Sequence, residues 1–453
     1  MFKRKAYDRM LAWKEKSHGR TALLIEGARR VGKSTIATEF AEREYRSHII
    51  IDFARAGRDV RGLFEDYRED LESFFAYLSA LYSVDLHERE TLIVFDEVQR
   101  FPLAREFVKY LVADGRYDYL ETGSLISIKA NVKDIVIPSE EHKLPMEPLD
   151  FEEFLWACGE EQLSALIRSS REELRPLPDA LHKKASRLMR EYLLVGGMPQ
   201  AVSQYLEEKN FAKVDEVKRG ILELYSNDVS RFGGAMAPKI RRLLRTIPGQ
   251  LSKHEKKFTL AAADPNARTE TWSEAFDWLE DARMVNLARS STDPSVALAL
   301  SEDGATLKCY MADTGLLVTQ SFLTSESTSD ETLRAVLFDQ LGINEGMLVE
   351  NYVAQQLRAR GDELFFYSRY DREDSSWNME IDFLVVRPFP DAAGKPRITP
   401  VEAKSTKRYG TKSLSKFRKR FPDRIGSEYV LHPRQLAVDG NRASLPLYMA
   451  HLV

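Results

Sequence analysis

The segment from Gly27 to Ser34 reads GARRVGKS and constrains the fold more than any other stretch of the chain. It follows an apolar run, residues 21–26, that predicts a buried strand, and it leads into residues 34–45, which have helical spacing. The segment matches G-x-x-x-x-G-K-[ST], in which glycines allow a tight loop whose N–H groups surround phosphate oxygens. A buried strand, such a loop and a helix in this order predict a parallel α/β sheet.

Each residue type in this loop suits the binding of a nucleotide. Lys33 would reach the β- and γ-phosphates of ATP, and the Ser34 hydroxyl would be a ligand of Mg²⁺. The start of the following helix adds the positive end of its dipole. The alternative is a glycine-rich turn at the start of a helix, with Lys33 in solvent. The predicted nucleotide-binding residues are Gly27, Ala28, Arg29, Arg30, Val31, Gly32, Lys33, Ser34 and Thr35.

A second motif lies where a later strand is predicted to end. The apolar run at residues 91–95 (TLIVF) leads directly into Asp96 and Glu97. Parallel sheets bind ligands at the carboxyl ends of their strands, so Asp96 would complete the Mg²⁺ site. Glu97 would orient and polarise the attacking water as the catalytic carboxylate. The alternative is that both acidic residues cap the next helix.

The strand that begins at residues 117–120 ends in the sequence Thr122-Gly123-Ser124. A hydroxyl beside the strand that carries Asp96 could contact the γ-phosphate or the attacking water. Thr122 and Ser124 are both candidates for this catalytic position. The alternative is a turn that the two hydroxyls stabilise.

The remaining chain is predicted to form a helical region, a winged helix and a second, smaller α/β or α+β unit. Apolar runs at 48–53, and at 134–137 or 143–146, complete five strands of the first sheet. Residues 150–231 have helical spacing, interrupted at Gly196-Gly197-Met198-Pro199. Helices followed by a hairpin, with Asp303-Gly304 as its turn, indicate a winged helix. Further predicted elements are a Ser/Thr/Asp-rich linker at 321–330, strands at 363–367, 380–386 and 399–403, and then a basic helix.

A second candidate site lies in this C-terminal region. Asp382 and the sequence Glu402-Ala403-Lys404 are on two predicted neighbouring strands, and alternation places Glu402 and Lys404 on one face. Asp382 and Glu402 could hold a second Mg²⁺ through hard oxygen ligands, with Glu350 as a further carboxylate. Lys404 could then orient water and stabilise charge on a phosphate. The alternative is a structural remnant in which Glu402 and Lys404 form an ion pair.

Motifs along nearly the whole chain resemble the bacterial and archaeal AAA+ ATPases that carry a C-terminal restriction-endonuclease-like domain. The matching stretches are GARRVGKST, LIVFDEVQR, LETGS, LPMEPLDFEEFL, YLLVGGMPQAV, WLEDARMVNLA, YMADTGLL and GMLVENYV. The second site resembles that of the PD-(D/E)xK nuclease fold. The resemblance implies an α/β fold with an AAA+-like ATPase core at 1–155, a helical lid at 156–235, a winged helix at 236–320, a linker at 321–340 and a nuclease-like domain at 341–453.

The resemblance also bears on oligomers and on partners. AAA+ rings use an arginine from a neighbouring subunit, for which Arg231 is a candidate; the alternative is a solvated arginine at a helix end. The net charge of -4 disfavours a globally basic nucleic-acid binder, but two local basic clusters remain. Both could contact DNA phosphates, or both could be solvated helix faces. The clusters are Lys239, Arg241, Arg242, Arg245, Lys253, Lys256 and Lys257, and the run of eight basic residues within 404–420.

Composition limits the remaining classes of protein. Only two cysteines occur, which excludes a disulfide scaffold and predicts a cytoplasmic location. No apolar run approaches the roughly 20 residues of a membrane-spanning helix. We therefore expect an Mg²⁺-dependent ATPase coupled to DNA, with possible metal-dependent cleavage. The alternative is a nucleotide-gated interaction or regulatory protein whose C-terminal module binds without cleaving. Besides ATP and DNA, the expected partners are a further copy of the chain, as a homo-oligomer, or another protein.

Overall fold

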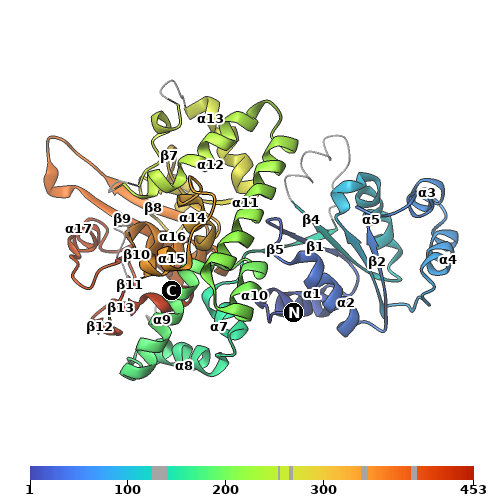
Figure 1. Ribbon diagram of the computed structural model, residues 1–453, viewed down its shortest axis with the longest axis horizontal. Helices are drawn as coiled ribbons and strands as arrows, with labels where there is room; N and C mark the ends of the chain where they lie inside the picture. The colour runs from blue at the N-terminus through green and yellow to red at the C-terminus, as the bar shows by residue number, and fades with distance from the viewer. Residues whose placement is uncertain (125–139, 254–255, 265–268, 338–344, 389–394) are drawn as a thin grey trace. The chain divides into compact units, whose positions relative to one another are not determined.

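The computed structural model describes residues 1–124, 140–253, 256–264, 269–337, 345–388 and 395–453 (Figure 1). The chain divides into two compact units, Met1–Glu147 and Pro148–Val453. None of the described helices is both long and apolar enough to span a membrane.

The first unit is a parallel sheet with the strand order β2-β3-β4-β1-β5. Along the strands, side chains alternate between two cores: Leu23 and Ile25 of β1 pack into one, and Ile93 and Phe95 of β3 pack into the other. Both faces are therefore buried, which is why the strands are continuous apolar runs. The strands are β1 (Ala22–Gly27), β2 (Ser47–Asp52), β3 (Thr91–Asp96), β4 (Asp118–Gly123) and β5 (Glu141–Met146).

Helices cover the two faces of this sheet. The core that contains Leu23 is closed by α1 (Lys5–Ser17) and α2 (Lys33–Glu44). The opposite core is closed by α3 (Arg58–Asp66), α4 (Leu71–Tyr82) and α5 (Pro102–Asp114). The predicted five-stranded α/β unit is thus confirmed. Of the two runs considered for the fifth strand, 143–146 lies in β5, and 134–137 lies outside the described residues.

The second unit combines a helical layer with an eight-stranded mixed sheet of order β12-β13-β11-β10-β9-β8-β6-β7. Its helices are α7 (Phe151–Ala157), α8 (Glu161–Glu172), α9 (Asp179–Val195), α10 (Pro199–Glu208), α11 (Phe211–Phe232), α12 (Ala237–Leu251), α13 (Thr269–Asp281), α14 (Thr314–Ser321), α15 (Asp330–Leu337), α16 (Glu345–Arg360) and α17 (Lys412–Arg420). Its strands are β6 (Val285–Ser291), β7 (Glu302–Met311), β8 (Leu364–Arg369), β9 (Met379–Pro388), β10 (Pro396–Ala403), β11 (Glu428–His432), β12 (Ala437–Asp439) and β13 (Arg442–Pro446).

The predicted hairpin exists, but its turn and its surroundings differ from the prediction. β6 and β7 are antiparallel, with Ser291 opposite Glu302, so the connection is residues 292–301. The prediction that Asp303-Gly304 forms the turn was wrong, because both residues lie in β7 beside a shift of register between Arg289 and Ser290. A glycine at a strand irregularity gives the same local signal as a glycine in a turn.

β6 also pairs in parallel with β8, which joins the hairpin to the C-terminal strands in one sheet. Residues 330–337 of the predicted linker form α15, and Arg219 of α11 donates hydrogen bonds to Ser325 O and Thr328 Oγ1 just before this helix. The predicted domain boundaries, the winged helix and the nuclease-like fold remain predictions.

Candidate functional site

The loop between β1 and α2 has the backbone that its glycines allow. Gly32 adopts a φ of 101°, in the left-handed region, immediately before α2 begins at Lys33. A Cβ on Gly27 would lie 2.4 Å from the carbonyl oxygen of Met146, so β5 leaves no space for a side chain there. The predicted phosphate loop therefore favours glycine at both ends. The reason at Gly32 is its positive φ, and the reason at Gly27 is the close packing of β5.

The side chains of the loop divide between core and solvent. Ala28 and Val31 are buried, so these two residues can reach a phosphate only through their backbone, whereas Arg29 and Arg30 are exposed. Ser34 and Thr35 are exposed and line one end of a hollow of about 550 Å³ that extends along α2 to Arg43.

Lys33 is largely buried beneath the loop, with 7% of its surface exposed. Its Nζ donates hydrogen bonds to the carbonyl oxygens of Gly27 at 3.0 Å and Ala28 at 2.9 Å. The loop therefore holds the ammonium beside the N–H groups that would surround a phosphate. A phosphate oxygen would offer the same ammonium a stronger, charge-assisted hydrogen bond.

Three of the predicted residues meet at the carboxyl edge of the sheet. The Ser34 hydroxyl donates to Asp96 Oδ1 at 2.7 Å, and the Thr122 hydroxyl donates to the same oxygen. These residues come from α2, β3 and β4, and 62 positions separate the first two. Ser34 and Asp96 present hard oxygen atoms of the kind that Mg²⁺ prefers.

Glu97 follows β3 in a conformation that is uncommon for a residue with a side chain. Its φ is 54°, its N–H donates to Thr122 Oγ1 at 3.2 Å, and its Oε2 accepts a hydrogen bond from Gln99 Nε2 at 2.7 Å. Non-glycine residues in the left-handed region cluster at functional sites. We did not predict the contact between Gln99 and Glu97. The only indication in the sequence was that Gln99 lies two residues after Glu97. Ser124 is partly buried just beyond β4, and its role remains a prediction.

Carboxylates and lysines of the second candidate site also lie close together. Lys404 Nζ is 3.0 Å from Glu402 Oε2, and the Ala403 N–H donates to Asp382 Oδ2 at 2.9 Å. Glu350, on α16, interacts with a different lysine, Lys308 of β7, at 3.1 Å. Among the described residues, no group of three or more His, Cys, Asp or Glu side chains could hold a metal ion.

Burial and neighbouring charges shift the carboxyl groups of this site in opposite directions. Burial raises the pKa of Glu402 to about 7, although Lys404 opposes the shift. Burial also raises the pKa of Asp382, and Glu350 adds to this effect. Burial acts in the same direction on Glu350, but Lys308 and Lys256 outweigh it and lower the pKa of Glu350 to about 2. The charge of Glu350 is therefore stabilised by lysines.

We did not predict Lys308, Tyr310 or Glu380 as members of this cluster. Lys308 is fully buried, and Glu380 Oε1 lies 2.6 Å from its Nζ. The Tyr310 hydroxyl donates to Glu350 Oε1 at 2.5 Å. The signal in the sequence was the spacing of Lys308 and Tyr310, which places both on one face of a strand.

Most residues of the two predicted basic clusters already have protein contacts. Lys256 pairs with Glu350, Lys239 lies over the ring of Trp272, and Arg418 pairs with Glu428. Lys407, Arg408 and Lys412 are exposed. Arg231, the candidate for the intersubunit arginine, lies over the ring of its neighbour Phe232.

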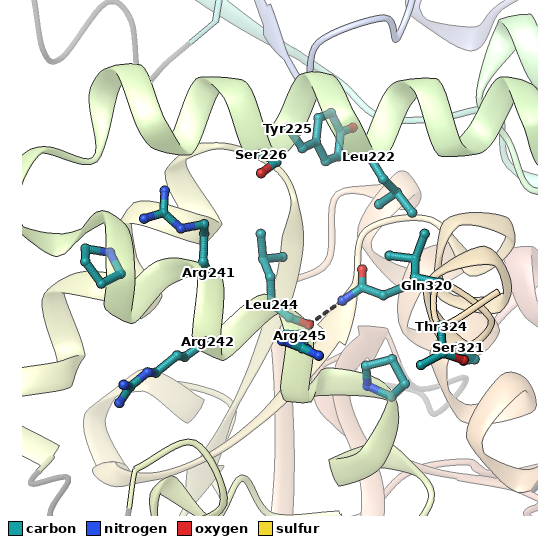
Figure 2. Close-up of a pocket in the computed structure, with 13 residues that line it drawn as sticks. Leu222, Tyr225, Ser226, Arg241, Arg242, Leu244, Arg245, Gln320, Ser321 and Thr324 are labelled. Carbon is teal, nitrogen blue, oxygen red and sulfur yellow. Dashed lines mark hydrogen bonds between the residues drawn. The ribbon is translucent and has the colours of Figure 1, made fainter. Parts of the chain in front are cut away.

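Three arginines of the first cluster line a pocket of about 770 Å³ between α11, α12 and the end of α14 (Figure 2). Three exposed arginines of α12, Arg241, Arg242 and Arg245, form one wall of this arginine pocket. Leu222 and Tyr225 of α11 lie opposite them (Figure 2). No Asp or Glu is among the described residues that line the pocket, although Arg242 pairs with Asp264 beside it at 3.1 Å.

A buried polar network explains three other motifs. The carboxylate of Asp313 accepts hydrogen bonds from the N–H groups of Gly197 at 2.6 Å and Leu316 at 2.9 Å, and from Gln355 Nε2 at 3.2 Å. A Cβ on Gly197 would lie 2.0 Å from the carbonyl oxygen of Leu149. This hydrogen-bond network therefore joins α9, α14 and α16. It contains residues of the three sequences VGGMP, ADTGL and NYVAQQ.

Family models match three regions of the chain. Residues 19–155 match the model described as AAA domain. Residues 186–327 and 345–448 match two domains of unknown function, DUF8612 and DUF4143. Comparison with curated proteins finds no match.

Two solved structures show weak similarity. They are PCH-2 from C. elegans, at 12% identity and a TM-score of 0.20, and AMPPCP-bound DnaA from Aquifex aeolicus, at 13% identity and a TM-score of 0.28. The matches cover 38% of this chain and 46% of PCH-2, and 62% of this chain and 87% of DnaA. TM-scores this low give no support for a shared fold beyond the match to the AAA domain. Residues 19–155 are therefore similar to the AAA domain, and two regions that match domains of unknown function follow them.

Proposed function

We propose that the first unit binds ATP with Mg²⁺ and hydrolyses it. The observation that supports this most directly is the meeting of Ser34, Asp96 and Thr122 at one carboxylate oxygen. These hydrogen-bonded hydroxyl and carboxylate groups lie at the carboxyl edge of the parallel sheet, beside the predicted phosphate loop. Parallel sheets bind ligands at this edge. The match of residues 19–155 to the AAA domain supports the same activity.

Each residue of the site has a defined task in this proposal. Lys33 exchanges its bonds to the loop carbonyls for bonds to the β- and γ-phosphates. Ser34 and Asp96 would hold Mg²⁺, which supplies positive charge at the phosphates as they react. Glu97 accepts a hydrogen bond from the attacking water and positions it in line with the γ-phosphate. Thr122 keeps Asp96 and the backbone of Glu97 in place.

The direct test is ATP hydrolysis by the full chain with Mg²⁺ and with excess EDTA. We expect ADP and phosphate to form only with the metal. A chain that binds no nucleotide under either condition would remove the basis of the proposal.

Thr122 and Ser124 can be separated by paired variants. We expect Thr122→Val to lower kcat by roughly tenfold to a hundredfold, because it removes both the hydrogen bond to Asp96 and the acceptor of the Glu97 N–H. Ser124→Ala should change kcat by less than about threefold. Steady-state ATPase rates decide between them, and the reverse order would assign the position to Ser124.

We further propose that the second unit couples ATP hydrolysis to nucleic acid through the arginine pocket. Arg241 and Arg245 lie one helical turn apart on α12, and Arg242 lies between them in sequence. Exposed guanidinium groups suit a row of backbone phosphates, which would compete with Ser230 for Arg241 and with Asp264 for Arg242. The rival function, a nucleotide-gated partner of another protein, predicts ATP turnover that does not respond to DNA.

The double variant Arg241→Ala/Arg245→Ala tests this coupling. Each lost phosphate contact should lower the slope of log affinity against log salt by about 0.9, so we expect a slope lower by about two. Fluorescence anisotropy with duplex DNA at several salt concentrations measures this slope. Arg175→Ala is the control, because Arg175 is an exposed arginine (79%) on another part of the same unit. Equal slopes for the wild type and the double variant would exclude the arginine pocket as the DNA contact.

A further inference from the structure

The carboxylates of the second candidate site surround an ammonium group. Lys308 Nζ is 2.6 Å from Glu380 Oε1, 3.1 Å from Glu350 Oε1 and 3.9 Å from Asp382 Oδ1. The lysine is fully buried and its ammonium also lies 5.1 Å from the centre of the Phe366 ring. Carboxylates from α16 and β9 thus share one cation that belongs to β7.

Other protein groups contact further oxygen atoms of Glu350 and Asp382. Glu350 Oε2 pairs with Lys256, and Glu350 Oε1 accepts the hydrogen bond of Tyr310. Asp382 Oδ2 accepts the N–H of Ala403. A Mg²⁺ ion requires oxygen ligands at about 2.0–2.1 Å that converge on one open position. These carboxylates converge on a lysine instead.

Lysines already supply positive charge to the cluster. Lys308 and Lys256 place two positive charges among three carboxylates, as many as one divalent cation would bring. Removing the charge of Lys308 would take a cationic partner from Glu350, Glu380 and Asp382. The residues therefore fit a metal poorly, although their positions in the sequence follow the nuclease pattern.

We propose that the ammonium of Lys308 stands in the place of a divalent cation between Glu350 and Asp382. The second unit then retains the carboxylates of a nuclease site but binds no metal with them and does not cleave DNA. The carboxylates serve as a structural ion cluster that joins β7 to α16 and β9. This proposal does not depend on ATP hydrolysis by the first unit.

Mn²⁺ binding to the full chain without nucleotide tests the proposal, with electron paramagnetic resonance as the readout. We expect the wild type and Asp382→Asn to bind the same number of Mn²⁺ ions. Lys308→Met keeps an unbranched side chain but removes the charge, so it should gain one Mn²⁺ site per chain. Lys308→Met/Asp382→Asn should lose this added site. Lys412→Met is the matched control, since Lys412 is an exposed lysine of α17, and it should gain none.

Two results would overturn the proposal. One is a Mn²⁺ site in the wild type, or Mg²⁺-dependent plasmid cleavage by it, that Asp382→Asn removes. The other is a folded Lys308→Met variant that gains no Mn²⁺ site. If Lys308→Met does not fold, the comparison of the wild type with Asp382→Asn decides alone, in both the binding and the cleavage assay.

Discussion

Replacing Glu97 with glutamine should abolish most ATP hydrolysis and leave ATP binding nearly unchanged. The amide keeps the size of the side chain and can still accept a hydrogen bond, but it cannot polarise water as a carboxylate does. We expect kcat to fall by roughly 10²–10⁴-fold, the usual contribution of a positioned acid–base group. The Kd for ATP should stay within about threefold of the wild-type value, because Glu97 follows β3 and is not part of the predicted phosphate loop. Calorimetry and a phosphate-release assay measure the two quantities.

Lys33→Ala provides the contrasting pattern in the same two assays. Removing the ammonium takes away a charge-assisted contact to the phosphates, so both Kd and kcat should worsen, with affinity at least tenfold weaker. Glu72→Gln is the control for Glu97→Gln, because its carboxylate is 87% exposed and lies on α4. Hydrolysis by Lys33→Ala at the wild-type rate would refute the proposed site. Loss of ATP binding in Glu97→Gln would show that Glu97 has a structural role instead.

The second large effect should follow from replacing Asp313 with alanine. Asp313 is completely buried, and its carboxylate accepts hydrogen bonds from two backbone N–H groups and from Gln355. Alanine would leave these buried donors unsatisfied, at about 1–3 kcal/mol for each. We expect the second unit to lose about 3–5 kcal/mol of its free energy of unfolding, within the range for a broken buried charge contact.

Urea unfolding followed by tryptophan fluorescence measures this loss. Trp13 is in the first unit and the other four tryptophans are in the second, so the signal reports mainly the second unit. Asp423→Ala, at an exposed aspartate of the same unit, should change stability by less than about 0.5 kcal/mol. An unfolding midpoint for Asp313→Ala equal to that of Asp423→Ala would show that the network adds no stability.

The first unit could be predicted closely because its signals are local. The predicted strand at 91–95 and helix at 34–45 agree with β3 and α2 to within one residue at each end. Strand, phosphate loop and acidic residues each carry their own chemical pattern. Parallel strands place their carboxyl ends on one edge of the sheet, so we could also expect Ser34 and Thr122 to lie close to Asp96.

The second unit could not be predicted to the same depth because its decisive contacts join distant residues. Nothing near Ala288 in sequence indicates that β6 pairs with Leu364 of β8. Lys308 lies in the sequence TLKCYM, where alternation predicts a strand but not the carboxylates that bury a lysine. The partner Glu350 is 42 residues away, a separation that no local pattern reports.

The ion cluster around Lys308 has a consequence for how this protein can be divided. Both of its lysines lie in residues 186–327 and its carboxylates lie in residues 345–448, two regions that match separate family models. A fragment cut between these regions would carry unpaired buried carboxylates on one side and an unpaired buried lysine on the other. The two regions can therefore be exchanged between proteins only as a pair, and the shortest transferable piece of the second unit contains both.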